Sequence, residues 1–138
     1  MRVFICVLFL ICIGCSTPNP IETKKHLSGY WIIQSVEMSD GAMKEFSFNP
    51  IIDFIEVTDT SGIRTKVEPQ LDGSYKNNGA VEKFTLKIEN DSLNLYYQTP
   101  FDNWKETVLI ATDSLLEIKN RDAKIYSYKR FVSFNFEE

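Results

Sequence analysis

Apolar and polar residues alternate along most of this 138-residue chain, in short runs that each end at a turn signal. Residues 81–89 show the pattern, because Phe84, Leu86 and Ile88 share one parity while lysine, threonine and glutamate hold the other. Successive side chains of a strand point to opposite faces, so this alternation predicts strands with one buried face. Clusters of Asn, Asp, Gly and Ser between the runs favour tight turns. The chain is therefore predicted to be all-β.

The runs predict eight strands, over residues 27–38, 51–57, 63–67, 81–89, 93–98, 104–111, 115–119 and 124–134. Residues 42–48 could form a short helix or an irregular crossover. Short links favour antiparallel pairing between neighbours along the chain. Eight such strands can close into an up-and-down barrel, which removes exposed edges and leaves room for side chains or one small ligand. The predicted fold is this eight-stranded antiparallel barrel, and an open sandwich is the alternative.

The first fourteen residues predict export. Met1 and Arg2 precede an apolar run from Val3 to Ile13, and Gly14 stands before Cys15. A positive charge, a short apolar core and a small residue are typical of a secretory signal, and the run is shorter than the roughly 20 residues that span a bilayer. The stretch resembles the signal of bacterial lipoproteins, in which the cysteine after the small residue is lipidated and becomes the new N-terminus. Two other cysteines do not fit, because each follows an isoleucine.

The lipoprotein resemblance implies a lipid-anchored envelope protein. Acyl chains such as palmitate on Cys15 would hold it, since each buried methylene contributes about 0.8 kcal/mol and two chains anchor firmly. Ser16 lacks the aspartate of inner-membrane retention, and no acidic run follows Cys15. By resemblance, these features favour the outer membrane and its periplasmic face, with surface exposure as the alternative. Residues 15–26 are polar and predict a flexible tether, which leaves residues 27–138 as the domain.

The composition excludes several classes of function. Without its first 14 residues the chain keeps 124, enough for one domain, and carries 14 basic against 19 acidic residues. That balance gives no long-range attraction to nucleic acid. The single histidine, His26, lies in the predicted tether, and all three cysteines precede residue 16. Because a catalytic triad, a thiol nucleophile or a His/Cys metal site needs such residues together, we predict no enzyme, metal or cofactor.

Two segments resemble the lipocalin superfamily. Gly29 and Trp31 form a Gly-x-Trp motif at the start of the domain, and Tyr128-Lys129-Arg130-Phe131 looks like the closing segment of small lipocalin-like lipoproteins of the Bacteroidetes type. The resemblance implies that Arg130 packs across the ring of Trp31 and closes one end of the barrel. A guanidinium over an indole contributes about 0.5 to 2 kcal/mol. Glycine at position 29 would allow the chain to approach closely there.

Several aromatic residues are candidates for a ligand site. Facing a cavity, they could stack on an apolar or planar molecule while a phenol or an amide supplies a hydrogen bond. The alternative, which the apolar content favours, is that they fill the core. The candidate residues are Tyr96, Gln98, Trp104, Tyr126 and Tyr128.

Two triplets resemble the Asp-Ser-apolar acceptor of O-glycosylation in Bacteroidetes. They are Asp91-Ser92-Leu93 and Asp113-Ser114-Leu115. Asp-Ser is also ordinary turn chemistry, with the leucine starting the next strand. The turn is the preferred interpretation.

The predicted function is the binding of a small apolar molecule by a lipid-anchored, lipocalin-like barrel. The first alternative is a barrel filled by its own side chains, which would act as a structural or protein-interaction module of the envelope. No particular protein partner is indicated. A hydrolase or isomerase on the same scaffold is disfavoured by the missing histidines and cysteines.

Overall fold

The computed structural model describes residues 18–133, over which one sheet curls into a closed barrel. Helix α1 (Pro20–Lys25) precedes the strands. The strands are β1 (Gly29–Glu37), β2 (Met43–Glu45), β3 (Ile52–Thr58), β4 (Ser61–Pro69), β5 (Tyr75–Asn77), β6 (Glu82–Glu89), β7 (Ser92–Gln98), β8 (Asn103–Ala111), β9 (Leu115–Lys119) and β10 (Ile125–Arg130).

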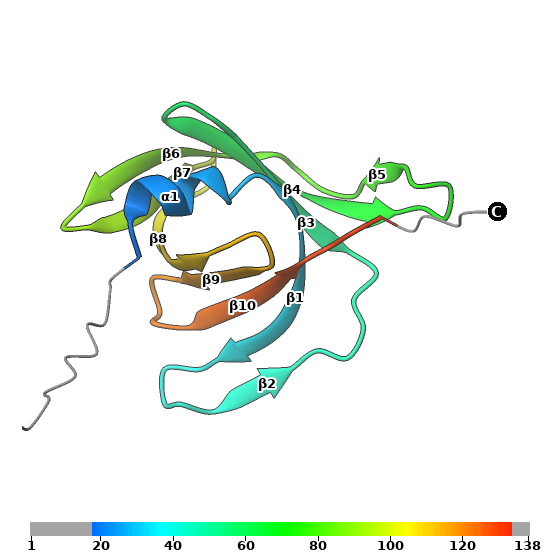
Figure 1. Ribbon diagram of the computed structural model, residues 1–138, viewed down its shortest axis with the longest axis horizontal. Coiled ribbons are helices and arrows are strands. Elements are labelled where there is room, and N and C mark those ends of the chain that lie inside the picture. Colours follow the sequence, from blue (N-terminus) through cyan, green and yellow to red (C-terminus); the bar gives the residue numbers. More distant parts are fainter. Residues whose placement is uncertain (1–17, 134–138) are drawn as a thin grey trace, which may run out of the picture.

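Eight of these strands form the barrel wall. Their order is β1-β3-β4-β6-β7-β8-β9-β10, and β10 pairs back onto β1 from Trp31↔Arg130 to Glu37↔Ile125. Every pair is antiparallel, which the alternation and short turns favour. Figure 1 shows β2 and β5 outside this ring, where they extend β1 and β4. The predicted eight-stranded barrel is confirmed, and the open sandwich is wrong.

The two extra strands differ from the sequence-based prediction. Residues 43–45 form strand β2, whereas a helix or an irregular crossover was expected, and β5 lies in a region predicted as turns. Strand β2 pairs with the end of β1, beyond a β-bulge between Ile33 and Ser35. Both strands have three residues, and all those of β2 are exposed. Backbone pairing without a buried face leaves no alternation in the sequence, which is why both were missed.

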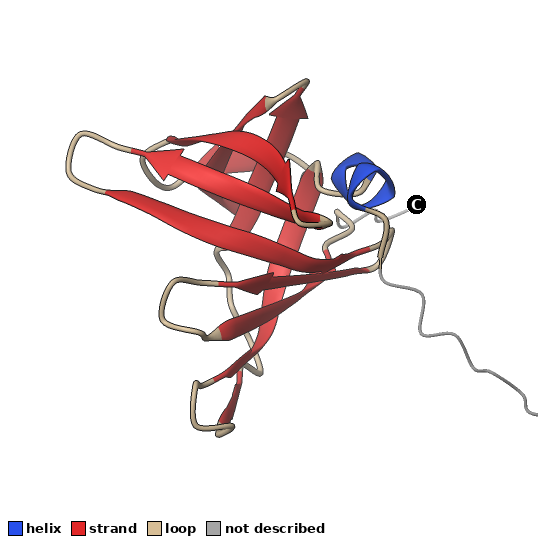
Figure 2. Cartoon of the chain, turned by 90° about the vertical axis from the view of Figure 1, so that its left-hand side faces the viewer, coloured by secondary structure: helices blue, strands red, loops and turns tan. Residues whose placement is uncertain are grey.

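Part of the predicted flexible tether is helical. The Asn19 side chain accepts a hydrogen bond from the Ile21 N–H at 3.0 Å, Pro20 opens the helix, and two lysines lie in its last turn. These are favourable helix-end positions. Thr23 is buried, and α1 contacts β7 and β8, so the helix covers one end of the barrel (Figures 1 and 2). A six-residue helix is too short to show a period in the sequence, and the lipidation candidate Cys15 lies outside the described residues.

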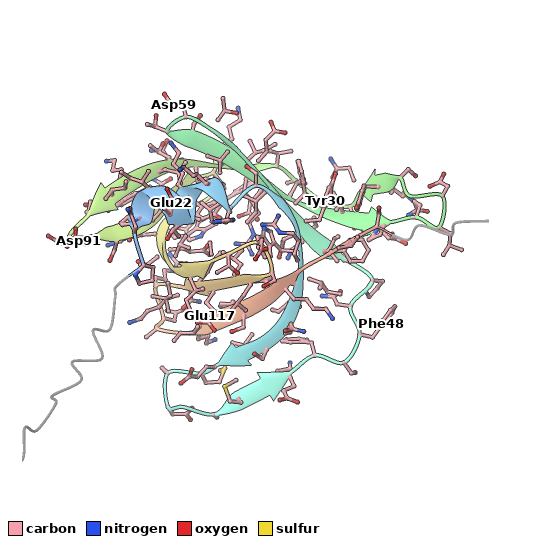
Figure 3. All side chains as sticks on the ribbon, viewed as in Figure 1. Glu22, Tyr30, Phe48, Asp59, Asp91 and Glu117 are labelled. Carbon is pink, nitrogen blue, oxygen red and sulfur yellow. The ribbon has the colours of Figure 1, made fainter. Side chains whose placement is uncertain are left out.

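Buried side chains fill the interior of the barrel, and Figure 3 shows many side chains inside the ring of strands. Near α1 this interior is apolar, with Trp31, Ile55 and Leu95 among its fully buried members. Toward the opposite end it becomes polar and includes buried Asp53. Ile88 shares the parity of the core but is 51% exposed, because β6 ends at the next residue. The two ends of the barrel therefore differ in chemistry.

No helix within residues 18–133 is long and apolar enough to cross a membrane.

Candidate functional site

The end of the barrel beside α1 is closed by Arg130. Its guanidinium carbon lies 4.1 Å from the centroid of the Trp31 ring, which is fully buried. The indole N–H of Trp31 donates to the Leu27 carbonyl at 2.9 Å. Arg130 itself donates to four backbone carbonyls, those of His26 at 2.8 Å, Ser28 at 2.9 Å, Asp113 at 2.6 Å and Thr112 at 3.3 Å. This one side chain ties the start of β1, the β8–β9 turn and the end of β10 together.

Glycine is required beside this contact. Gly29 has φ +139°, and a Cβ there would lie 2.2 Å from Nη1 of Arg130. A side chain at position 29 would therefore both strain the backbone and displace the guanidinium. The structure thus brings Gly29, Trp31 and Arg130 into one contact.

A second arginine lies in the middle of the barrel, where it bridges four strands. The Arg64 guanidinium donates through Nη2 to the Tyr128 hydroxyl at 2.7 Å and to Asp53 at 3.2 Å. Through Nη1 it donates to Glu106 at 3.2 Å and to the Tyr97 hydroxyl at 3.5 Å. Neither acidic side chain is more than 14% exposed. The buried charges are thus paired and hydrogen-bonded, as burial requires.

The two acids beside Arg64 respond to burial in opposite ways. Desolvation disfavours the charged form of both acids and acts to raise the pKa of each. Asp53 overcomes it because Arg64 and the Lys66 ammonium, which lies at Oδ1, together lower its pKa. Glu106 has one cationic partner among residues 18–133, Arg64, and burial raises its pKa. The pKa of the Tyr128 hydroxyl is also raised by burial, to about 12, so that it remains a neutral donor and acceptor.

A cavity of about 210 Å³ opens beyond this cluster, at the end away from α1. Its lining combines branched apolar side chains, phenols, an amide and both signs of charge. The lining residues are Ile33, Arg64, Lys66, Glu106, Ile118, Asn120, Tyr126 and Tyr128. We call this space the open-end cavity. Its mixed lining can contact an apolar surface and a polar group at the same time.

The aromatic residues predicted as ligand contacts divide between two faces. Tyr126 and Tyr128 line the open-end cavity. Trp104 stacks on the ring of Tyr97, with centroids 4.8 Å apart, and packs against the core. These three residues therefore share the barrel interior.

Tyr96 and Gln98 are not part of that interior. They line a groove of about 410 Å³ on the outer surface. There the Tyr96 hydroxyl donates a hydrogen bond to the Glu89 carboxylate, and the Lys87 ammonium lies 5.0 Å from the centroid of the Tyr96 ring. Parity explains the split, because Leu93, Leu95 and Tyr97 alternate inward on β7 and leave positions 96 and 98 outside. That signal was available in the sequence.

The charged cluster was missed by sequence reasoning. Asp53 interrupts the apolar run Ile51–Ile55, and Arg64 follows an apolar residue, so each could be recognised only as a charge with inward parity. No short sequence motif links the three residues: Asp53 and Arg64 lie on the neighbouring strands β3 and β4, whereas Glu106 comes from β8, 42 positions beyond Arg64. Within residues 18–133, no group of three His, Cys, Asp or Glu side chains could hold a metal ion. Of the serines in the two Asp-Ser-Leu triplets, Ser114 is exposed and Ser92 is half-buried.

The fold and the cavity define a class of protein: a small β-barrel with one end closed by a helix and an arginine, and an open end containing a cavity. The profile of the lipocalin-like domain family matches residues 27–118, and the chain belongs to this family. A solved lipocalin-like protein from Bacteroides uniformis ATCC 8492 is similar, at 11% sequence identity and a TM-score of 0.48, over 77% of this chain and 99% of that one. No curated protein matches the sequence.

Proposed function

We propose that this chain is a binding protein that holds a small molecule in its open-end cavity. The observation that carries the proposal is the cavity of about 210 Å³ at the open end of a barrel that is closed at its other end. Concave sites that combine apolar walls with a few polar groups are the usual form of small-molecule sites. The open-end cavity is a more polar version of such a site, because Ile33, Ile118 and the ring of Tyr126 share its lining with two cations, a carboxylate and an amide.

The filled interior limits the size of the ligand. Trp31, Tyr97 and neighbouring core residues occupy the barrel between α1 and the Arg64 cluster. A long acyl chain would have to displace them, at a cost of several kcal/mol in lost packing. The proposed ligand is therefore compact, with an apolar body against the isoleucines and a polar group toward the charges.

A filled barrel that binds a protein through its outer surface is the second candidate. It is supported by exposed apolar residues on loops at the open end. Phe101 is 97% exposed, Phe48 82% and Leu71 74%; Figure 3 shows Phe48 pointing away from the barrel. Exposed apolar groups of this kind are common at interaction sites. This candidate needs no cavity, so a test of cavity occupancy separates the two.

Native mass spectrometry of the domain from Ser16 onward, released gently from its own host, tests the binding proposal. We expect a bound small molecule that is lost on denaturation. The matched variant Ile118→Trp fills the open-end cavity and should be purified without it, whereas Ile88→Trp on an exposed position should retain it. A wild-type protein with no bound molecule and no change on cavity filling would favour the protein-binding candidate.

We also propose that Cys15 is lipidated and holds the domain at the outer membrane, facing the periplasm. The support is the sequence alone: a short apolar run after Arg2 and a small residue before Cys15. Metabolic labelling with palmitate should label the wild type and Cys12→Ala, but not Cys15→Ala. Label retained in Cys15→Ala would refute the assignment. Fractionation of the same cells locates the labelled protein.

A further inference from the structure

We propose that the ligand of the open-end cavity is a small organic anion, a carboxylate, held by Lys66. This inference rests on the proposed binding function and specifies its ligand class. Arg64 already occupies the position between Asp53 and Glu106, and its guanidinium carbon lies 5.6 Å from the centroid of the Tyr128 ring. The chain therefore supplies its own cation to the buried acids, and a cationic ligand would have to compete with it.

Lys66 is the second cation of the cavity lining. The Lys66 ammonium contacts Asp53, and its side chain is 52% exposed at the cavity. An ammonium has three N–H groups, so one carboxylate contact leaves donors for a ligand. Lys66 is thus the accessible cation of the lining, while Arg64 is 13% exposed and bonded to four partners.

Two neutral groups of the lining add to this donor surface. The Asn120 side-chain oxygen accepts from the backbone N–H groups of Asp122 at 2.9 Å and Lys124 at 3.0 Å. Its amide NH₂ donates to no other group in the described part of the chain, and the Tyr126 hydroxyl has no hydrogen-bond partner among residues 18–133. An ammonium, an amide NH₂ and a phenol together favour an acceptor, and charge-assisted bonds to a carboxylate are the strongest of these contacts.

The apolar part of the lining sets the rest of the ligand. Ile33, Ile118 and the ring of Tyr126 share the cavity with these donors. A volume of about 210 Å³ accommodates a carboxylate on one ring or on a short branched chain. The carboxylate would approach Lys66, and the apolar body would lie against the isoleucines.

Phenylacetate and its uncharged analogue phenylacetamide test the charge requirement with one shape. Affinities are measured by fluorescence of the half-buried Trp104 and by chemical-shift changes in the full domain. We expect phenylacetate to bind wild type at least tenfold more tightly than phenylacetamide. A parallel titration with phenyl phosphate shows whether the site prefers the planar carboxylate or accepts any anion of this size.

Two variants and a control place the preference at Lys66. Lys66→Met should abolish the preference for the carboxylate, whereas Lys129→Met, an exposed lysine on β10, should leave it unchanged. Asn120→Asp keeps the oxygen that accepts hydrogen bonds in its turn but replaces the amide donor with a negative charge. It should therefore weaken the binding of phenylacetate and not that of phenylacetamide. Asn120→Asp also serves if Lys66→Met fails to fold.

Equal affinity of wild type for phenylacetate and phenylacetamide, or a preference unchanged in Lys66→Met, would overturn the inference. So would an uncharged or cationic molecule found bound by native mass spectrometry, a result that leaves the binding function intact. A barrel without a bound molecule that takes neither probe would overturn both proposals.

Discussion

Two arginines lie inside this barrel, and they are stabilised in different ways. Arg130, at the closed end, donates to four backbone carbonyls and covers the Trp31 ring. Arg64, in the middle, is paired with two carboxylates and two phenols. Burial lowers the pKa of Arg130, and Asp113 only partly opposes it. Burial works against the charge of Arg64 as well, but its four partners together outweigh burial and raise its pKa.

The difference shows what each end can do. Backbone carbonyls do not titrate, so none of the four acceptors of Arg130 at the closed end changes its protonation with pH. Carboxylates titrate and can exchange partners, so the Arg64 cluster can respond to protons and to a ligand. The closed end therefore contributes mainly to stability, and the open end is the region where binding can occur.

The largest effect is expected at the closed end. Trp31→Ala removes a fully buried ring and the support of Arg130, and should lower the free energy of unfolding by about 3 to 5 kcal/mol. Urea denaturation measures it. Trp104→Ala, which removes a half-buried ring, should cost clearly less. Unchanged stability in Trp31→Ala would show that the Trp31–Arg130 contact does not close the barrel.

Arg64→Met should have the next largest effect, about 3 kcal/mol, because it leaves buried acids without their shared partner. Lys66 still pairs with Asp53 and Glu106 can take up a proton, which limits the loss. In Arg64→Met combined with Glu106→Gln, part of the stability should return. If the double variant is less stable by the full sum of both changes, the cluster is not coupled.

Gly29→Ala should destabilise the fold by about 1 to 3 kcal/mol, because φ +139° is strained for alanine and the new methyl meets Arg130. Gly41→Ala is the matched control. It also has positive φ, at +88°, but a methyl group added there would have no atom within 4 Å. Thermal unfolding of both separates the steric contact from backbone strain. Equal losses would mean that Arg130 moves aside freely.

The smallest effect is the pH dependence of the open end. Between the ordinary pKa of 4.5 and the raised pKa of folded Glu106, the folded state holds more protons, so stability increases as pH falls. Below the ordinary pKa of 3.8 the lowered pKa of Asp53 acts oppositely, and stability is lost as pH falls. Glu106→Gln should remove the first of these two pH dependences, which changes the free energy of unfolding by about 1 kcal/mol or less. Arg130→Lys should retain it. Denaturation across pH 3 to 8 checks both.

The strands of the barrel could be predicted because each carries its own alternation. Val81 to Glu89, for example, was predicted as a strand, and Glu82–Glu89 forms β6. The same logic failed for β2, whose exposed residues have no periodic signal, and for α1, which is too short to show one. At the candidate site, Tyr126 and Tyr128 could be predicted to share one face of the last strand, and both line the open-end cavity. Tyr96 and Gln98 line the outer groove, because Leu93, Leu95 and Tyr97 take the inward positions of β7.

The sequence by itself determined that the chain is all-β and has eight wall strands. It also indicated that the start of β1 and the end of β10 come together. These follow from local alternation, turn residues and a short motif, each readable within a few positions. Only the tertiary structure decided that Asp53, Arg64 and Glu106 meet, since their contacts join residues 11 and 42 positions apart. Strand pairing around the barrel sets those contacts, and with them the charge and the size of the open-end cavity.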